Sequence, residues 1–362
     1  MSNSQNFSIR KFKNEDVDEI LNLLNNVFKQ KFTRDWWKWK YELNPSGFRG
    51  QDGDIWVAES EHKIVGHYAL IPEKIKFYSR VIDIAQSVDT ATHPDFRGKG
   101  VFTALAKKVY SAAKNRYPFL IGFPSAMAYR GFLNMGWKDL SPVPEHTKIL
   151  DYNSFSNRKF SNPIYSQSAK TLLKTCYHLT QLPKSLKFSS IKGTNVEIEQ
   201  IKKFSSEFDP FWDKSRMKYN IVMERTSAFL NWRFSKQFGS YQFFIARSTK
   251  ENEILGYVVI KNSINSLDII DLIALQDQDK AILELIDTAV RTCKDLGLDS
   301  IRCWFPKWHK SSNLLVNKGF ISLKNLTFRK NVPKVIFYSF AQDIEIPKSN
   351  DWFFTYADTD YA

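Results

Sequence analysis

Residues 87–102 read Ser-Val-Asp-Thr-Ala-Thr-His-Pro-Asp-Phe-Arg-Gly-Lys-Gly-Val-Phe, which is the pattern of a strand that turns into a helix. Residues 81–92 are rich in β-branched and apolar side chains, and Pro94-Asp95 ends them with turn-forming residues. After Gly100, apolar residues recur at helical spacing with lysines between them. The sequence therefore predicts a strand, a glycine loop and a helix in direct succession.

The loop at residues 97–100, Arg-Gly-Lys-Gly, indicates a site for phosphate groups. Glycine lets a ligand approach the backbone closely, and the free N–H groups and dipole at a helix start favour negative charge. Such a loop is also compatible with an ordinary surface turn. A buried-type strand over residues 119–123 and a second helix ending at Gly136-Trp137 follow, and they favour the phosphate interpretation.

This arrangement resembles the core of the GNAT family, whose members transfer acyl groups from acetyl-CoA to amines. The family's loop signature is Arg/Gln-x-x-Gly-x-Gly/Ala, and Arg97-x-x-Gly100 fits it. Residues 132–137, Phe-Leu-Asn-Met-Gly-Trp, are similar to the family's Tyr-x-x-x-Gly-Phe motif. Two positions depart from the family, since Phe102 replaces a small residue and Phe132 replaces the tyrosine that often protonates the CoA thiolate.

The resemblance implies which residues hold acetyl-CoA or another acyl-CoA. In the family, the loop and the first helical turn bind the pyrophosphate, and the preceding strand pairs with the pantetheine arm. One N–H group of that strand would bond the acyl carbonyl. The residues implied are Thr90, Ala91, Thr92, Arg97, Gly98, Lys99, Gly100, Val101, Phe102 and Thr103.

Acyl transfer also needs groups that accept and donate protons. Asp89 is the strand carboxylate nearest the expected reaction position, so it is a candidate base, with a structural carboxylate as the alternative. His93 titrates in a useful pH range, although it directly precedes a proline and such positions often belong to turns. Tyr129 is a candidate acid or, alternatively, a core tyrosine. Gln86 lies nearer the place where some family members have a glutamate, and it cannot act as a base.

Composition restricts the class of protein. The 362 residues, 43% of them hydrophobic, suffice for two globular domains. Lysine and arginine number 52 against 38 acidic residues, and the net charge of +14 suits nucleic acid, an anionic membrane or a phosphate-rich cofactor. The excess is spread along the chain, so solvated lysine faces are the default interpretation.

Cysteine usage and hydropathy point to a cytoplasmic protein. Cys176, Cys293 and Cys303 are odd in number and lack Cys-x-x-Cys spacing, which argues against disulfides and zinc; we expect no metal. A catalytic Cys176 would need a nearby base that the sequence does not indicate. No apolar run reaches the roughly 18 residues of a membrane helix, and the first residues do not resemble a signal peptide.

The aromatic run at residues 36–41, Trp-Trp-Lys-Trp-Lys-Tyr, has two interpretations. It could form a stacking platform for bases or sugars, but we favour core or domain-interface packing. Residues 151–192 have a different pattern, with an amphipathic helix from Leu172 to Leu182, and we interpret them as a linker.

The rest of the chain repeats the first part. Residues 230–234 are similar to 37–41, residues 254–257 to 64–67, and residues 304–306 and 318–320 to 122–124 and 135–137. These matched landmarks in the same order indicate tandem domains. Where the first copy has its glycine loop, the second has Gln276-Asp277-Gln278-Asp279-Lys280, whose carboxylates would repel phosphate. We therefore expect one cofactor site.

The expected fold class is α+β (α/β), with two tandem GNAT-like domains, each a mixed, mostly antiparallel twisted sheet flanked by helices. The N-terminal domain with the acyl-CoA site should span residues 1–150, a helical linker 151–192, and a degenerate second domain 193–330. Residues 331–362 should form a C-terminal strand and a docked tail. The tail could merely pack, or Asp358, Asp360 or the Ala362 carboxylate could reach the active site as a base.

The resemblance implies an acyl-CoA-dependent N-acyltransferase that acts on a primary amine of a small molecule or amino sugar by direct attack in a ternary complex. An aminoacyl-tRNA-dependent transferase of the peptidoglycan-bridge type is an alternative, but the intact glycine loop favours CoA. A non-catalytic CoA- or nucleic-acid-binding module is a second alternative. The partners expected are acyl-CoA and an amine acceptor, and we do not expect nucleic acid or a membrane span.

Overall fold

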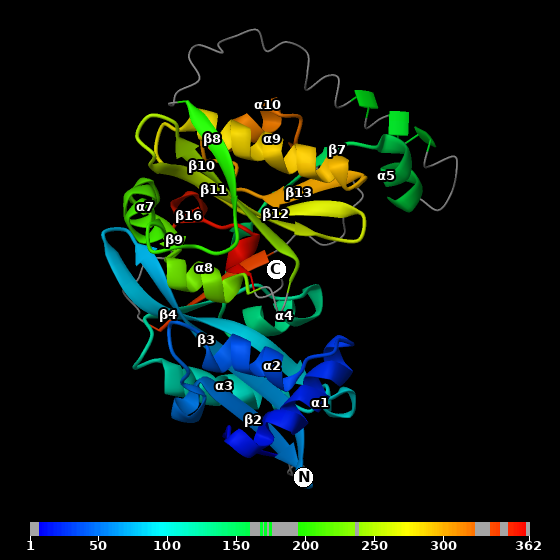
Figure 1. Cartoon of the computed structure of the whole chain (residues 1–362). Coiled ribbons are helices and arrows are strands. Elements are labelled where there is room, and N and C mark those ends of the chain that lie inside the picture. Colours follow the sequence, from blue (N-terminus) through cyan, green and yellow to red (C-terminus); the bar gives the residue numbers. More distant parts are fainter. Residues whose placement is uncertain are drawn as a thin grey trace. The chain divides into compact units, whose positions relative to one another are not determined.

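The computed structural model describes residues 7–159, 167–168, 170–171, 174–175, 195–235, 239–322, 334–340 and 347–359. The chain divides into two compact units (Figure 1). The N-terminal unit contains Met1–Pro142, Ile221–Glu224 and Pro333–Asp351, and the C-terminal unit contains Val143–Asn220, Arg225–Val332 and Trp352–Ala362.

The N-terminal unit is built on one mostly antiparallel sheet. Its strands follow the order β1 (Ser8–Lys11), β2 (Ile55–Ser60), β3 (Lys63–Phe77), β4 (Arg80–Thr92), β5 (Phe119–Gly122), β15 (Lys334–Ser339) and β6 (Lys138–Pro142), and β9 (Ile221–Met223) also pairs with β3. The pair β4–β5 is parallel, and the other pairs are antiparallel. The helices are η1 (Asn14–Asp16), α1 (Val17–Phe28), α2 (Arg34–Trp37), η2 (Lys38–Glu42), η3 (Gly50–Asp54), η4 (Pro94–Phe96), α3 (Val101–Ala113), α4 (Ala126–Asn134) and η7 (Ser349–Asp351).

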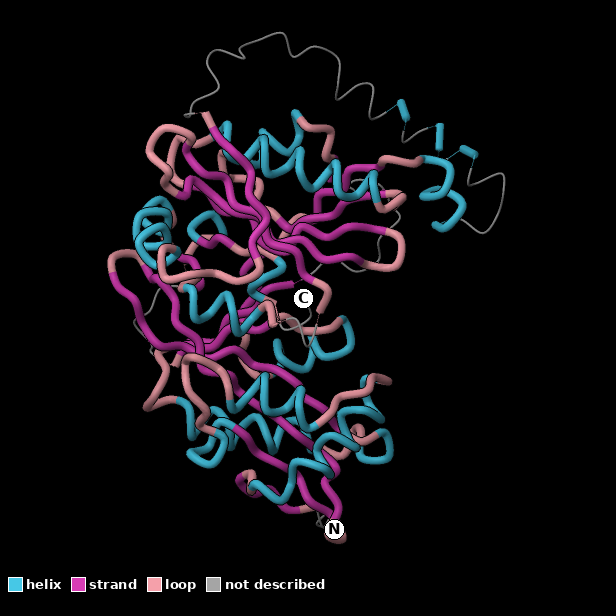
Figure 2. Tube along the Cα trace, viewed as in Figure 1, coloured by secondary structure: helices cyan, strands magenta, loops and turns pink. Residues whose placement is uncertain are grey.

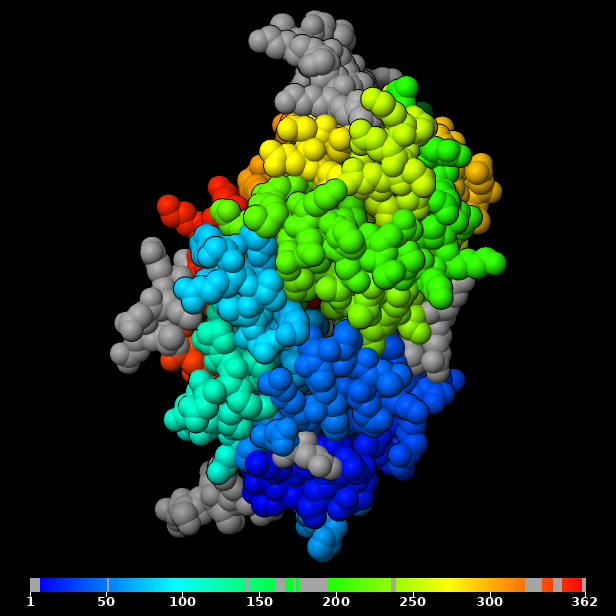
Figure 3. All heavy atoms as spheres, turned by 60° about the vertical axis from the view of Figure 1, so that its left-hand side comes forward, coloured from blue at the N-terminus to red at the C-terminus, as the bar shows by residue number. Residues whose placement is uncertain are grey.

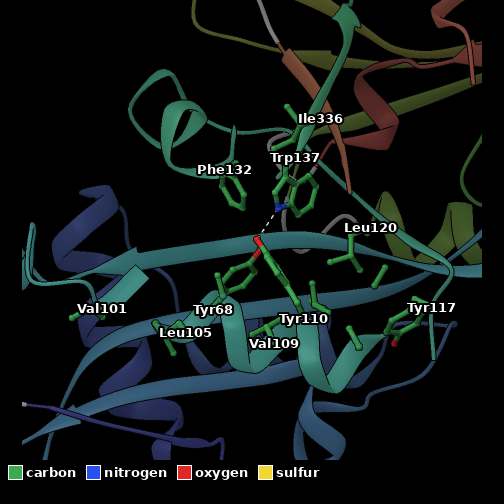
Figure 4. Packing of buried hydrophobic residues seen from close by; sticks show 14 of the residues in the cluster. Tyr68, Val101, Leu105, Val109, Tyr110, Tyr117, Leu120, Phe132, Trp137 and Ile336 are labelled. Carbon is green, nitrogen blue, oxygen red and sulfur yellow. Dashed lines mark hydrogen bonds between the residues drawn. The ribbon is translucent and has the colours of Figure 1, made fainter. Parts of the chain in front are cut away.

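Two hydrophobic clusters cover the two faces of this sheet. Successive side chains of a strand point to opposite faces, so Tyr68 packs with the α3 side and Ala69 with the α1 side. Figure 4 shows the α3 side, where Leu105 and Trp137 belong to one buried cluster. A Cβ at Gly66 would lie 2.5 Å from the Cγ1 of Val101, so glycine here is what allows α3 to pack closely on β3.

The C-terminal unit repeats this plan. Its sheet has the strand order β14 (Ile321–Ser322), β7 (Glu145–Ile149), β13 (Ser300–Trp304), β12 (Ser266–Ala274), β11 (Ile254–Asn262), β10 (Tyr241–Ser248) and β8 (Val196–Ile201), and β12–β13 is the parallel pair. Its other elements are α5 (Tyr152–Lys159), α7 (Phe208–Ser215), η5 (Arg216–Lys218), α8 (Ser227–Arg233), α9 (Asp279–Asp295), α10 (Ser311–Asn317), β16 (Trp352–Phe353) and η8 (Tyr356–Asp358).

The predicted fold class is confirmed, because each unit is a mixed, mostly antiparallel sheet bordered by helices (Figure 2). The repeat extends to the register of the strands. Gly66 lies opposite Thr92 at the end of β4, and Gly256 lies opposite Ala274 at the end of β12. The two units are therefore two copies of one strand and helix arrangement.

The units do not follow the boundaries expected from the sequence. Strand β7, expected in the first domain, pairs with β13 in the C-terminal unit, and β15, expected after the second domain, lies between β5 and β6 of the N-terminal unit. Strand β9, from the middle of the second copy, pairs with β3. A strand joins whichever sheet edge offers it hydrogen-bond partners, and chain order does not decide which edge that is.

The aromatic run near residue 37 packs in the core, as favoured by the sequence. Trp37 is 1% exposed and lies against Phe12 and Tyr41, with ring centroids 5.4 and 4.4 Å away. The amphipathic helix expected around Cys176 falls outside the described residues.

The turn between β3 and β4, sky-blue in Figure 3, lies on the surface, and Tyr78 and Val81 are exposed there.

Among the residues that the structure describes, no helix has the length and apolar character needed to cross a membrane.

Candidate functional site

The glycine loop lies between η4 and α3 with its backbone open to solvent. Gly98 and Gly100 have φ angles of +75° and +83°, in the left-handed region that glycine adopts without strain. A Cβ built on either glycine would meet no atom within 4 Å, and both residues are exposed. The glycines thus serve the backbone conformation and leave free space beside it, where a ligand could approach.

Several N–H groups of this loop and of the first turn of α3 have no acceptor among the described residues, whereas the N–H of Lys99 donates to the Phe96 carbonyl at 3.4 Å. Gly100 caps α3 without a side-chain hydrogen bond, and the first helical bond runs from the N–H of Ala104 to the Gly100 carbonyl at 3.0 Å. No acceptor is found in the described part of the chain for the N–H groups of Gly98, Gly100, Val101, Phe102 and Thr103. Unpaired N–H groups at a helix start carry partial positive charge and bind anions.

Arg97 and Lys99 add full positive charges to this loop, and both side chains are exposed. The Lys99 ammonium lies 4.9 Å from the ring centroid of Phe96, which keeps the charge beside the loop. The loop therefore combines free N–H groups, a helix dipole and two cations, which is the chemistry that binds a diphosphate.

Strand β4 leaves its neighbour β5 before it reaches the loop. The two strands pair over Ala85–Ser87 and Leu120–Gly122, while β4 continues to Thr92 and remains paired with β3. Among the described residues, Val88 to Thr92 have no partner strand on the β5 side. The predicted pantetheine-binding residues Thr90, Ala91 and Thr92 lie on this free edge.

A β-bulge occurs at the point where the two strands separate. His67 lies opposite Ala91 and Ala69 lies opposite Val88, so β4 has one residue more than β3 in this interval. Asp89 lies in the bulge with a φ of +47°, which is uncommon for a residue that has a side chain. The backbone at the expected reaction position is therefore locally irregular.

Three neighbouring side chains bind Asp89. The Lys40 ammonium donates to Oδ1 at 2.9 Å and lies 2.8 Å from Oδ2, and the Tyr41 hydroxyl donates to Oδ2 at 2.5 Å. The His67 Nδ1 lies 2.8 Å from the Asp89 main-chain carbonyl, so it carries the proton and donates. The side chains of Lys40 and Asp89 are only 5% and 7% exposed.

His67 is fully buried on β3, and burial lowers its pKa below the usual 6.5. The ring is therefore neutral near pH 7, with Nδ1–H on the Asp89 carbonyl. Its Nε2 atom is buried and has no hydrogen-bond partner in the part of the chain that the structure describes.

The other two predicted catalytic side chains lie apart from this cluster. His93 lies at the end of β4 with its side chain 33% exposed, and its Nδ1 accepts a 3.4 Å hydrogen bond from the N–H of Asp95. Tyr129 lies on α4, where its hydroxyl donates to Asp139 at 2.5 Å. This hydrogen bond raises the pKa of Tyr129, which makes the hydroxyl a weaker proton donor.

The two phenylalanines that depart from the family pattern pack against each other. The rings of Phe102 and Phe132 have centroids 5.3 Å apart, and each lies 6.2 Å from the ring of Tyr68. The Tyr68 hydroxyl accepts a hydrogen bond from Ser87, and burial raises its pKa well above 10. The Tyr110 hydroxyl accepts a hydrogen bond from Trp137 at 2.7 Å, drawn in Figure 4, and burial raises its pKa to about 12.

The equivalent loop of the C-terminal unit is neutralised by its own side chains. Asp277 and Asp279 lie at the start of α9, where the Lys310 ammonium is 3.4 and 3.2 Å from their carboxylates. The Lys218 ammonium donates to the carbonyl of Ala274, the counterpart of Thr92, at 2.5 Å. Burial lowers the pKa of Lys218 to about 7.

The C-terminal segment, residues 352–359, covers the place where β12 leaves β13. The pairing of these strands ends at Ile269, and two residues further on the carboxylate of Asp271 accepts a 3.0 Å hydrogen bond from Thr355. Tyr356 stacks on Trp304 at the end of β13, with ring centroids 4.6 Å apart. The C-terminal segment thus occupies the position that corresponds to the free edge of β4.

A buried ion pair holds the C-terminal segment in the C-terminal unit. The Arg225 guanidinium donates to Asp271 at 2.8 Å and to Asp358 at 2.6 Å, and all three side chains are 0% exposed. Asp358 is one of the tail carboxylates that the sequence offers as a possible base. Its carboxylate is paired inside this cluster, while Asp360 and Ala362 lie outside the described residues.

The structure places the predicted glycine loop directly after the end of β4, and the sequence analysis missed the partners of Asp89. In the sequence, Lys40 and Tyr41 stand out only as part of the aromatic run, and His67 only as a landmark of the repeat. The available signal was the polar His67 inside the otherwise apolar strand 64–71. No group of three or more potential metal-ligating side chains occurs among the described residues.

A known domain family matches most of the N-terminal unit. Residues 8–138 match the family model of the acetyltransferase (GNAT) domain. No curated protein sequence matches the chain significantly.

Solved structures share the fold over most of the chain. A conserved protein of Enterococcus faecalis, described as a probable N-acyltransferase, has a TM-score of 0.62 at 13% identity, over 92% of this chain and 72% of its own. A GCN5-related N-acetyltransferase from Anabaena variabilis has a TM-score of 0.63 at 12% identity, over 92% of this chain and 73% of its own. Another GCN5-related N-acetyltransferase, from Kribbella flavida, has a TM-score of 0.59 at 14% identity, over 91% of this chain and 70% of its own. Residues 8–138 therefore match the acetyltransferase (GNAT) domain, and the solved structures share the fold of the chain.

Proposed function

We propose that the protein is an acyl-CoA-dependent N-acyltransferase that binds one acyl-CoA per chain, at the glycine loop of the N-terminal unit. The acceptor is a primary amine of a small molecule or amino sugar. The amine nitrogen bonds to the thioester carbonyl carbon in a ternary complex, the C–S bond breaks, and CoA leaves as the thiol. One proton of the acceptor ammonium passes to the thiolate and another to solvent.

The observation that carries this proposal is the set of N–H groups of Gly98 and of residues 100–103, which have no acceptor among the described residues. A surface turn would satisfy such groups with its own side chains or with water, without needing two left-handed glycines that face open space. Here, the groups lie at the start of a 13-residue helix, beside two cations and at the end of a strand with a free edge.

The residues present fit an acyl-CoA. The pyrophosphate would be held by the loop N–H groups together with Arg97 and Lys99, and the pantetheine arm by the backbone of residues 90–92. Acyl-CoA supplies the acyl group as a thioester, whose carbonyl an N–H group of β4 would polarise. This division of roles uses the two features that the C-terminal unit has lost, the open loop and the free strand edge.

His93 and Tyr129 remain proposals for proton transfer. A cytoplasmic location is likewise a prediction from the sequence.

The experiment is a free-thiol assay with acetyl-CoA and a panel of primary amines, accompanied by calorimetric titration with CoA. Gly100→Asp places a carboxylate at the loop and should abolish both thiol release and CoA binding. Gly297→Asp is the matched control, because Gly297 also has a positive φ, +65°, with no atom within 4 Å of its Cβ position, but lies in the C-terminal unit. Equal CoA affinity in wild type and Gly100→Asp would refute the proposed site, and a stoichiometry of two would refute the single site.

A further inference from the structure

The bulge at Asp89 is strained and yet held by many contacts. A residue with a Cβ and a φ near +47° costs free energy, and an interrupted ladder loses strand pairing. Such a conformation persists only where surrounding contacts determine it. At Asp89 these contacts come from two other elements, η2 and β3, and they bind both the side chain and the main chain.

The helix η2 is of the wide π type, and this explains how two consecutive residues reach one carboxylate. A π-helix has more residues per turn than an α-helix, so neighbouring side chains diverge less, and short π segments are frequent at functional sites. Lys40 and Tyr41 both contact Asp89 in this way. The π segment is in turn held by Trp37, which packs 4.4 Å from Tyr41 and 6.3 Å from His67.

The cluster does not have the arrangement of a general base. Both carboxylate oxygens of Asp89 already accept hydrogen bonds from charged or hydroxyl donors, and the side chain is 7% exposed. A buried ion pair adds little net stability compared with apolar residues of the same volume. Stability alone therefore does not account for the cluster, whereas a fixed backbone at the bulge does.

We propose that Lys40, Tyr41, His67 and Asp89 are positioning residues, which hold the bulge of β4 so that the N–H groups of residues 90–92 meet the thioester carbonyl of the bound acyl-CoA. This inference rests on the proposed function. The four residues act through the backbone of β4 and need not touch the substrate. The phosphate loop is a separate part of the site, so its affinity for CoA should not depend on these four residues.

The test compares CoA with acetyl-CoA, and therefore needs no knowledge of the amine acceptor. Affinities for both are measured by calorimetry, and infrared difference spectroscopy with acetyl-CoA, isotope-labelled at the acetyl carbonyl, reports how strongly the bound carbonyl is polarised. The variants are Asp89→Ala, and Asp89→Gly as a second variant that keeps the left-handed backbone accessible. Asp83→Ala is the matched control, because Asp83 also lies on β4 and pairs with a lysine of β3, Lys74, at 3.1 Å, but away from the bulge.

We expect wild type and Asp83→Ala to shift the carbonyl band to lower frequency on binding. Asp89→Ala should lose most of this shift, and its preference for acetyl-CoA over CoA should fall about tenfold, the scale of one lost hydrogen bond. Its CoA affinity should stay within about twofold of wild type. His67→Asn, which keeps a donor near the Nδ1 position, should retain more of the band shift than His67→Ala.

Three outcomes would overturn the inference. A wild-type band shift and affinity ratio in both Asp89→Ala and Asp89→Gly would show that the cluster does not position the carbonyl. An equal loss of CoA and acetyl-CoA binding, with a lower melting temperature, would show a structural role only. If the wild-type protein binds neither compound, the proposed function itself is refuted and the inference with it.

Discussion

The ion pair between Arg225 and Asp358 gives a direct prediction about the C-terminal segment. In Asp358→Ala, the fully buried guanidinium loses its 2.6 Å contact but keeps the Asp271 carboxylate, and the N–H of Thr355 loses a 2.7 Å acceptor. Breaking a buried pair by removing one partner costs about 3 to 5 kcal/mol. Because Asp271 remains, we expect the lower end, about 3 kcal/mol in the free energy of unfolding of the C-terminal unit.

Urea unfolding followed by tryptophan fluorescence measures this loss. With a denaturant dependence of about 3 kcal/mol per molar urea, the midpoint of the C-terminal unit should fall by about 1 M. Glu253→Gln is the control, since it removes the exposed pair with Lys214 and should cost less than about 1 kcal/mol. If both variants unfold at the wild-type midpoint, the C-terminal segment is not held by its ion pair, and our account of the covered edge of β12 is refuted.

Other predictions concern single positions. Gly66→Ala should lower the free energy of unfolding of the N-terminal unit by about 1 to 3 kcal/mol, since its Cβ would lie 2.5 Å from Val101; an unchanged melting temperature would contradict the packing of α3 on β3. Lys218→Met should stabilise the C-terminal unit by about 1 to 2 kcal/mol at pH 6 and by less at pH 10. Burial lowers the pKa of this lysine to about 7, so its charged form, which predominates at pH 6, destabilises the folded state. Urea denaturation at both pH values measures the difference. Because burial lowers the pKa of His67, the unfolded chain binds a proton at this histidine more readily than the folded chain does. The unfolding free energy of the N-terminal unit should therefore fall as the pH drops below 6.5, and it should fall less steeply in His67→Gln. If wild type and His67→Gln have parallel pH profiles of stability, His67, which faces Asp89 and Lys40, is not the source of this pH dependence.

The signal for the glycine loop could be recognised in the sequence because it is local. Gly98 and Gly100 are needed by the backbone conformation itself, and the apolar spacing after residue 100 requires a helix at that point. The tandem repeat was equally visible, since each copy must form the same elements in the same order. Among the described elements, strand register at Gly66 and Gly256 follows the repeat closely.

The exchange of β7 and β15 between the two units could not be predicted in this way. Both strands are short, and nothing in their own side-chain patterns specifies one sheet over the other. The choice of sheet depends on which edge is available once the other elements have packed, and that is a property of the whole fold.

The sequence by itself determined the strand, loop and helix around residues 87–113 and their repetition, because dihedral preferences and apolar periodicity act between near neighbours in the chain. Only the tertiary structure decided the roles of Asp89 and Asp358. Asp89 meets residues 48 and 49 positions away, and Asp358 meets an arginine 133 positions away. Buried charges select their partners by distance in space, because a charge removed from water is stabilised only by the groups that surround it in the folded chain.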